Sequence, residues 1–440
     1  MRTKIWLVVL LALATLSLVV VSCGGGGVNA VSWTGTKQMG VAGKNTIANG
    51  IAVDASGNVY VAGYTNGGLD NNALTGSFDF FITKFNALGN KVYTKQTGTS
   101  GKTTMASGLA VDLDGNVYAA GYTDGGLDGN VLTGTSDFFV SKYGPSGNLL
   151  STIQTGTTGK SAGAQGIAVD PIGNVYVTGY TYGGLAGNPL VGVSDYFLFK
   201  YGPAWNLLYS KQTGSAGKYS EGYGVAVDSN NNAYVAGRTT GGLGSNTLVG
   251  TYDLFLAKHD SSGAALSTYE TGSTGLYSSA VGVAVDAGDN VYIAGVTNAG
   301  LDNNTLTGTS DFILIKINAA GNKVYTRQMG AAGTDTKSSG IAVDSNGYVY
   351  ITGYTLGGLD GHALTGTRDY FLVKYDPDGN RIWTRQSGVT GKLAEATGVA
   401  VDANNNVYVA GYTDGGLDGN VLAGTYDFFI AKYDSDGNKK

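Results

Sequence analysis

Residues 50–65 read GIAVDASGNVYVAGYT, and a similar stretch returns six more times along the chain. Its aspartate recurs every 58 residues without a slip, at Asp54, Asp112, Asp170, Asp228, Asp286, Asp344 and Asp402. Self-similarity at one fixed period is the mark of repeat architectures. Seven copies of 58 residues cover 406 of the 440 residues, so we expect one closed unit rather than several domains.

One copy contains four short segments of strand-forming residues, separated by turn residues. In the first copy the four strands are expected at 50–54, 59–65, 79–85 and 91–97. Tight turns fall at 55–58 and 87–90, and a long Gly-rich loop at 66–77 separates the second and third strands. No segment keeps a 3.6-residue apolar period, so the prediction is an all-β protein.

Four-stranded units in several copies are typical of a β-propeller, here with seven blades. The last copy stops after its second turn, at 437–438, and lacks its outer strand. The start of the chain matches the missing piece: Gln38, Gly40, Gly43 and Lys44 lie 58 residues before Gln96, Gly98, Gly101 and Lys102. We therefore expect residues 31–40 to pair with strand 427–433 and complete the last blade. Lys439 and Lys440 lie beyond the last turn and are expected to contribute little.

The first 30 residues differ from the repeats. Arg2 and Lys4 precede an apolar run at 5–21, the pattern of a secretory signal peptide. A transmembrane helix is the alternative, since about 17 apolar residues is near the lower limit for spanning. The stretch VVSC at 20–23 resembles the lipobox of bacterial lipoproteins, which implies cleavage before Cys23 and lipidation of this single cysteine. The expected divisions are a signal peptide (1–22), a lipidated Cys with a Gly-rich tether (23–30) and the propeller (31–440).

The repeat unit resembles a known family. Its pattern G-I-A-V-D-x-x-G-N-V-Y-V-x-G-Y-T, followed by D-F-F-x-x-K, is similar to the SBBP-type seven-bladed propeller repeat of secreted and surface proteins of bacteria. The resemblance covers residues 31–438, with mild departures: Tyr348 replaces the turn Asn, and Arg238 and Val296 replace a Tyr of the second strand. It implies the propeller fold and an extracytoplasmic location, but no defined activity.

Composition and charge argue against several functions. The net charge is -5 and no run of Lys or Arg is present, which disfavours nucleic-acid binding. Only two histidines occur, His259 and His362, and both stand where other copies carry different residues. Together with one cysteine they are too few for a Ser-His-Asp set or a His-rich metal cluster. The sequence therefore leaves enzymatic activity open and favours its absence.

Three charged residues recur in all seven copies and are Asp54, Asp79 and Lys84 in the first. A catalytic centre needs one constellation, whereas these form seven equal ones, so we interpret them as structural. Asp54 is expected to tie its turn as an Asx turn. Lys84 is expected to pair with a buried or half-buried carboxylate.

Calcium is the cofactor that the turns bring into consideration. Alternating oxygen donors occur at 112–116, 376–380 and 434–438, and the long loop carries Asp70 and Asn72. An EF-hand loop also needs an acidic residue at its twelfth position, which is Thr123 for the first turn and Ser387 for the second. We therefore interpret these segments as turns and predict no cofactor or metal site, with calcium at the long loop as the alternative.

Ligand-binding residues are expected on the long loops. The connections between the second and third strands, and those between copies, are long and emerge on one face around the mouth of the central channel. Specific binding needs residues that break the sevenfold repetition. The candidate ligand-binding residues are Tyr219, Glu221, Tyr223, Arg238, Asp335, Lys337 and Glu395.

The sequence favours a non-enzymatic binding or scaffold lipoprotein of the cell envelope, a monomer that holds a protein, peptide or glycan on this face. Its lipid anchor would place it at a membrane. Gly24 lacks the Asp that retains such lipoproteins at the inner membrane, which favours the outer membrane or cell surface. The alternative is a carbohydrate-active hydrolase or lyase that uses acidic residues at the channel mouth. Glu221 and Glu395 are the pair for this alternative, although they lie three blades apart.

Overall fold

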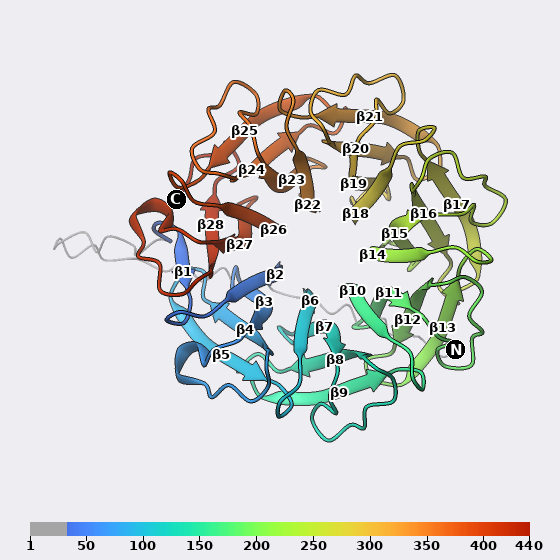
Figure 1. The fold of residues 1–440 in the computed structure, drawn as a ribbon, viewed down its shortest axis with the longest axis horizontal. Coiled ribbons are helices and arrows are strands. Elements are labelled where there is room, and N and C mark those ends of the chain that lie inside the picture. The colour runs from blue at the N-terminus through green and yellow to red at the C-terminus, as the bar shows by residue number, and fades with distance from the viewer. Residues whose placement is uncertain (1–32) are drawn as a thin grey trace, which may run out of the picture. The chain divides into compact units, whose positions relative to one another are not determined.

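The computed structural model of the chain describes residues 33–440, whose regular structure is β-strand apart from two short 3-10 helices. Seven four-stranded sheets stand around a common axis as the blades of a propeller (Figure 1). The predicted fold class is therefore confirmed. No helix within 33–440 is long and apolar enough to cross a membrane.

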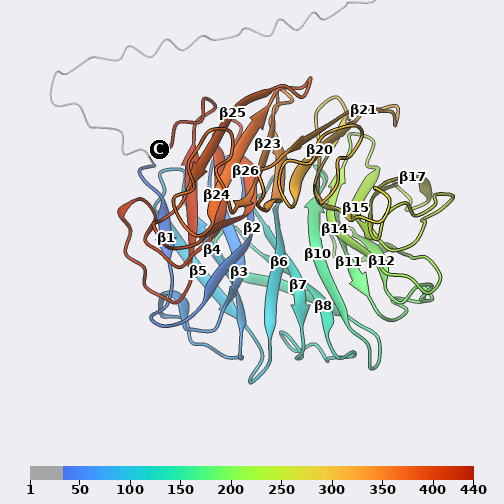
Figure 2. The same cartoon turned by 45° about the horizontal axis from the view of Figure 1, so that its top comes forward.

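Each blade is an antiparallel meander whose strands follow one another from the axis outward. The innermost strands are β2 (Thr46–Val53), β6 (Thr104–Val111), β10 (Ala162–Val169), β14 (Ser220–Val227), β18 (Ser278–Val285), β22 (Thr336–Val343) and β26 (Ala394–Val401). The second strands are β3 (Val59–Thr65), β7 (Val117–Thr123), β11 (Val175–Thr181), β15 (Ala233–Thr239), β19 (Val291–Thr297), β23 (Val349–Thr355) and β27 (Val407–Thr413). Figure 2 shows the innermost strands β2, β6 and β10 side by side across the thickness of the ring.

The third strands are β4 (Asp79–Phe85), β8 (Asp137–Tyr143), β12 (Asp195–Tyr201), β16 (Asp253–His259), β20 (Asp311–Ile317), β24 (Asp369–Tyr375) and β28 (Asp427–Tyr433). The outer strands are β5 (Lys91–Thr97), β9 (Leu149–Thr155), β13 (Leu207–Thr213), β17 (Ala265–Thr271), β21 (Lys323–Met329), β25 (Arg381–Ser387) and, for the last blade, β1 (Lys37–Met39). Two single-turn 3-10 helices, η1 (Leu69–Asn71) and η2 (Leu417–Gly419), lie in the long loops of the first and last blades.

The innermost strands begin four residues earlier than the sequence predicts, because each contains a β-bulge. In β2 the pairing with β3 shifts between Ala48 and Gly50, so Asn49 is the extra residue. The same shift occurs at the equivalent place in all seven blades. A bulge re-aims the side chain that it inserts, and here the inserted side chains belong to the strands nearest the axis.

The hydrophobic core lies between neighbouring blades. The second and third strands, such as β3 and β4, are buried along nearly their whole length, which explains their unbroken apolar runs. Aromatic rings of the third strands pack across the blade boundaries, with centroids 5.1 Å apart for Phe80 and Phe139 and 5.4 Å apart for Phe81 and Phe428. The second pair joins the first blade to the last and closes the ring.

The N-terminal strand completes the last blade as predicted. β1 pairs antiparallel with β28, with Gln38 opposite Phe429, although the strand covers 37–39 rather than the expected 31–40. Ahead of the strand, the buried Trp33 ring packs against Phe85 of the first blade and Tyr408 of the last, at centroid distances of 6.2 and 5.5 Å. Polar contacts accompany this packing.

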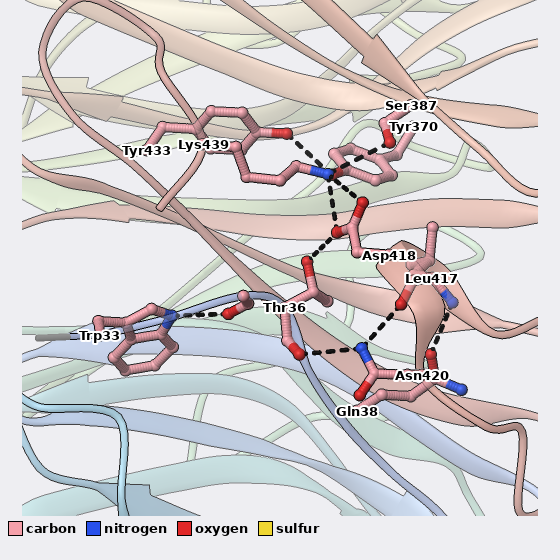
Figure 3. A network of polar contacts seen from close by, with 11 residues as sticks. Trp33, Thr36, Gln38, Tyr370, Ser387, Leu417, Asp418, Asn420, Tyr433 and Lys439 are labelled. Carbon is pink, nitrogen blue, oxygen red and sulfur yellow. Dashed lines mark hydrogen bonds and ion pairs between the residues drawn. The ribbon is translucent and has the colours of Figure 1, made fainter.

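Figure 3 shows the polar contacts of the N-terminal segment with the long loop of the last blade. The amide of Leu417 donates to the side-chain oxygen of Gln38 at 3.0 Å. The side-chain amide of Asn420 donates to the carbonyl of Thr36 at 3.0 Å, and the Thr36 hydroxyl donates to Asp418. The segment is therefore held through side chains as well as through its three-residue strand.

The expectation for the last two residues was wrong. Lys439 forms a bridge with Tyr433 in the register that begins the outer strand of the other blades. Its Nζ lies 2.9 Å from the carboxylate of Asp418 (Figure 3). The amide of Lys440 donates to the carbonyl of Lys432 at 2.9 Å. The outer strand of the last blade is therefore divided between the two ends of the propeller, which sequence alignment of the copies alone did not reveal.

Candidate ligand-binding site at the channel mouth

A cavity of 490 Å³ lies on the propeller axis and is lined by the bulge residues of all seven innermost strands. These residues are Asn49, Ser107, Gln165, Tyr223, Val281, Ser339 and Thr397, with Arg238 and Ser279 beside them. Arg238 is the last residue but one of β15, directly before a long loop. The cavity therefore opens toward the long-loop face, where the sequence predicted a site.

A ring of glycines narrows the channel below the bulge residues. Each bulge residue is followed by Gly, and a Cβ added to Gly224 would lie only 3.0 Å from Cα of Gly282 in the next blade. The innermost strands thus approach backbone to backbone at this level. The glycines and the residues after them, such as Ile51, line a second cavity of 190 Å³ that shares Asn49 and Tyr223 with the first.

The fourth blade brings three of the predicted residues together. Arg238 binds one oxygen of Glu221 through two guanidinium nitrogens, at 3.0 and 2.8 Å. The hydroxyl of Tyr223 donates to the same carboxylate oxygen at 2.5 Å. The guanidinium centre lies 5.5 Å from the Tyr223 ring centroid and 4.9 Å from that of Tyr252. Burial, reinforced by the bond to Glu221, raises the pKa of Tyr223 well above its ordinary value, so its phenol stays a donor.

The remaining predicted residues form separate pairs. Lys337 lies 3.1 Å from Asp335, which also accepts from the Ser310 hydroxyl at 2.8 Å. Glu395 forms an ion pair with Arg368, a residue that the sequence analysis did not single out. The Arg368 guanidinium stands 4.2 Å from the Tyr354 ring centroid.

Tyr219 differs from the other candidates. Its side chain is 42% exposed, and its amide donates to the Thr240 hydroxyl at 2.9 Å. It is not among the residues that line the cavity within 33–440. We therefore place it at the outer rim of the fourth blade, where its backbone contact holds two long loops together.

Two of the three repeated charged residues anchor the backbone. The carboxylate of Asp54 accepts from the amides of Ser56 and Asn58, both at 2.9 Å, which is the contact pattern of an Asx turn. Asp79 is fully buried and accepts from the amide of Gly76 at 2.7 Å and from the side chain of Gln96 at 2.9 Å. Both residues are thus occupied by their own blade.

The carboxylate partner expected for Lys84 is not its partner in the structure. Its Nζ donates to the carbonyl of Pro145 in the next blade at 3.1 Å and stands 5.0 Å from the Tyr60 ring centroid. The hydroxyl of Tyr60 already donates to Asp54 at 2.9 Å, which leaves the ammonium to reach across the blade boundary. Among the seven equivalent lysines, Lys258 alone comes within ion-pair distance of a carboxylate, at 3.8 Å from Asp228.

The turns considered for calcium use their oxygens internally. In the first of them one carboxylate oxygen of Asp112 accepts from the amides of Asp114 and Asn116, and the other accepts from the Asn116 side chain and the Tyr118 hydroxyl. Within the described part of the chain no group of three or more His, Cys, Asp or Glu side chains is placed to hold a metal ion. Cys23 lies outside the described residues.

The sequence analysis missed most of the bulge ring. A usable pattern was present, because the position before the invariant Gly carries six different residue types in the seven copies, whereas its neighbours hardly vary. The pattern does not by itself reveal a bulge, because a bulge cannot be recognised from the strand residues alone. The two short polar residues at Ser107 and Ser339 therefore looked like ordinary strand positions.

Comparison with known proteins decides the family. A model described as "SBBP: Beta-propeller repeat" matches six stretches, at 35–70, 92–128, 152–186, 208–244, 324–360 and 382–418. This chain is a β-propeller of SBBP repeats. The SBBP propeller is 24% identical over 451 aligned residues to an uncharacterised WD repeat-containing protein, L264, of Acanthamoeba polyphaga mimivirus, covering 78% of the chain. It is 30% identical over 171 residues to the regulatory protein FlaEY of Caulobacter vibrioides, covering 34% of the chain.

The SBBP propeller spans only 32% and 18% of the length of these two relatives. Among solved structures, a chain in the crystal structure of the mitotic checkpoint complex superimposes with a TM-score of 0.50 at 12% identity, covering 90% of this chain and 95% of that one. At this identity the likeness concerns the fold alone.

Proposed function

We propose that the SBBP propeller is a non-catalytic binding protein that holds its ligand in the bulge ring at the channel mouth. The observation that carries the proposal is that the residues of this ring differ from blade to blade and together line a cavity on the axis. Six residue types occur at its seven positions, each between a small residue and an invariant Gly. A rigid scaffold with local asymmetry at a concave site is the arrangement that specific recognition requires.

The chemistry of the ring favours an uncharged, hydroxyl-rich ligand such as a segment of an oligosaccharide. Its side chains are hydroxyls, amides, one phenol and one isopropyl group, and none carries a charge. The charged groups above the ring are already paired, Arg238 with Glu221 and Arg368 with Glu395. An ionic ligand would lose hydration here without meeting an unpaired charge, so its binding would be weak. Sugar hydroxyls would find donors, acceptors and aromatic faces.

The ion pairs of Glu221 and Glu395 also favour binding over catalysis. A glycoside hydrolase, the first of the two enzyme types considered above, needs one carboxyl group to supply a proton and another to act as base or nucleophile. Glu221 and Glu395 lie on β14 and β26, and each is engaged by its own arginine. These contacts hold the two carboxylates within their own blades.

Replacing Tyr223 by Ser should weaken oligosaccharide binding about tenfold, because the ring loses an aromatic face and the acceptor oxygen of the phenol. Two sister blades carry Ser at this position, at Ser107 and Ser339, so the fold should accept the change. Binding is measured on an array of neutral and acidic oligosaccharides, followed by calorimetry with the best neutral one. Leu113→Ala, in a tight turn and 73% exposed, is the matched control. Equal loss in the control, or binding of acidic sugars only, would count against the proposed site.

We further propose that the protein is a monomeric lipoprotein of the cell envelope, anchored at Cys23, with the outer membrane or cell surface favoured over the inner membrane. The proposal rests on the charged and apolar start of the chain and on the VVSC stretch at 20–23. The acyl chains of a lipidated cysteine would insert into the bilayer and supply the membrane affinity that the acidic propeller lacks.

Cys23→Ala should move the protein from the membrane fraction to the soluble fraction, since the acylated side chain is removed. Fractionation followed by immunoblotting measures the distribution, and mass spectrometry of the wild-type N-terminus measures the acylation. Cys23→Ser serves as a second variant that also lacks the thiol. Membrane retention of both variants after cleavage of the signal would rule the anchor out.

A further inference from the structure

Six of the seven blades fasten their long loop with the same glutamine on the outer strand. In the first blade the Gln96 side-chain oxygen accepts from the amide of Leu69 at 2.8 Å, and its nitrogen donates to Asp79 at 2.9 Å. The nitrogen also donates to the carbonyl of Gly67 at 3.1 Å. The equivalent bond to the buried aspartate spans 2.9 or 3.0 Å in the other five, from Gln38, Gln154, Gln212, Gln328 and Gln386.

The fourth blade has a glutamate in this place. Glu270 Oε2 accepts from the amide of Leu243 at 2.9 Å, as the glutamine oxygen does in the sister blades. Its other oxygen, Oε1, therefore stands where they have the amide nitrogen. Oε1 is buried and has no hydrogen-bond partner. The side chain that it faces is the fully buried Asp253, which already accepts from the amides of Val249 and Gly250, both at 2.7 Å.

We propose that Glu270 is held in its protonated form and donates from Oε1 to Asp253, so that a proton fastens the long loop of the fourth blade. The proton replaces the amide hydrogen that the six glutamines supply. Without it two carboxylates would face each other in a buried site with no donor between them, which is costly. This protonated contact between Glu270 and Asp253, the proton clasp, belongs to the fold of the fourth blade and does not depend on the proposed ligand.

The surroundings of Glu270 favour the protonated form. Burial raises the pKa of Glu270, and the charge of Asp253 raises it further, against the lowering effect of the Leu243 amide. Asp253 on β16 is the charged group that faces it. On the loop before β14, the side chain of Lys218 packs against Gly241. A Cβ added to Gly241 would lie 2.6 Å from Cγ of Lys218. No other charged side chain acts on Glu270 among the described residues.

The pH dependence follows from the raised pKa. A carboxyl group whose pKa is higher in the folded protein stabilises the fold fully below its unfolded value of about 4.3. This stabilisation is lost as the pH rises through the folded value. The loop concerned, residues 240–252, carries Tyr252 against Arg238 at the channel mouth. Loss of the proton therefore loosens one wall of the mouth as the pH rises.

Thermal unfolding of the full chain at pH 4.5 and pH 8 tests the proton clasp. Glu270→Gln should raise the midpoint by about 2 °C at pH 8 and by much less at pH 4.5. The reverse change in a sister blade, Gln212→Glu, should lower the midpoint at pH 8 and have little effect at pH 4.5. Hydrogen exchange gives a local measure, because the amides of Val249 and Gly250 should exchange about tenfold more slowly at pH 8 in Glu270→Gln.

Three results would overturn the proposal. The first is an equal shift of the midpoint by Glu270→Gln at both pH values, which would indicate packing rather than protonation. The second is a Gln212→Glu variant whose stability does not depend on pH. The third is a wild-type midpoint that falls on adding EDTA or rises on adding calcium chloride, which would place a cation between the two carboxylates.

Discussion

Deleting residues 28–40 should separate the first blade from the last and cost more than about 5 kcal/mol of unfolding free energy. The buried Trp33 ring packs against Phe85 of the first blade and Tyr408 of the last. Truncation of a buried Trp by itself lowers the unfolding free energy by about 3–5 kcal/mol. The deletion also removes β1 and leaves the edge of β28 unpaired along residues 428–430. Urea unfolding measures the stability, and light scattering should detect aggregation through the freed edge.

The matched comparison is deletion of Lys439 and Lys440 at the other end of the same divided strand. This change removes one backbone hydrogen bond and two ion pairs, of Lys439 with Asp418 and of Lys440 with Asp434, so we expect a loss of about 1–2 kcal/mol. A deletion of 28–40 that unfolds like the parent chain would contradict ring closure by the N-terminal segment. An equal loss from the two deletions would contradict the dominant role of Trp33.

Asp195→Ala should destabilise the propeller by about 4 kcal/mol, the second largest effect that we expect from a change in this chain. The side chain is fully buried and accepts from the amides of Val191 and Gly192, at 2.8 and 2.7 Å, and from Gln212 at 2.9 Å. Alanine would leave the two buried amides without a partner, remove the bond from Gln212 and release the long loop of the third blade. Urea unfolding measures the loss of stability.

The chain itself offers a matched control for this change. Asp128 also lies on a long loop, with φ 51°, and the third copy carries Ala186 at the equivalent position with φ 47°. Asp128→Ala should therefore cost less than about 1 kcal/mol. A large loss in the control with little loss in Asp195→Ala would show that the exposed aspartates, rather than the buried ones, hold the loops.

Most of the fold was predictable because one 58-residue pattern recurs in seven copies, so each copy supports the strand assignments made in the others. The fixed interval between copies of Asp54, the turn glycines and the register of Gln38 with Gln96 defined blade number, strand order and closure. The bulge at Asn49 was not predictable, because it depends on how closely the innermost strands meet around the axis. The role of Lys439 was missed for a related reason, since pairing with Tyr433 depends on where the outer strand is interrupted.

The candidate site was predictable in part. Departures from the repeat pointed to Glu221, Tyr223 and Arg238, which the structure joins in one cluster. Their pairing could not be derived, because residues 221 and 238 lie on different strands that are adjacent only in the folded blade. Whether a side chain lines the channel or packs against the next blade depends on a single register shift. Alternation along a strand therefore cannot decide it.

The divided outer strand has a consequence for the order of the chain. Lys37 pairs with Ile430 and Lys439 with Tyr433, so both ends of the propeller rest on one strand, three residues apart. A short peptide joining the ends, with a new opening in the tight turn of another blade, would leave every strand pair intact. Circular permutation should therefore preserve the architecture. The chain could thus start at any blade without changing the order of the blades around the ring.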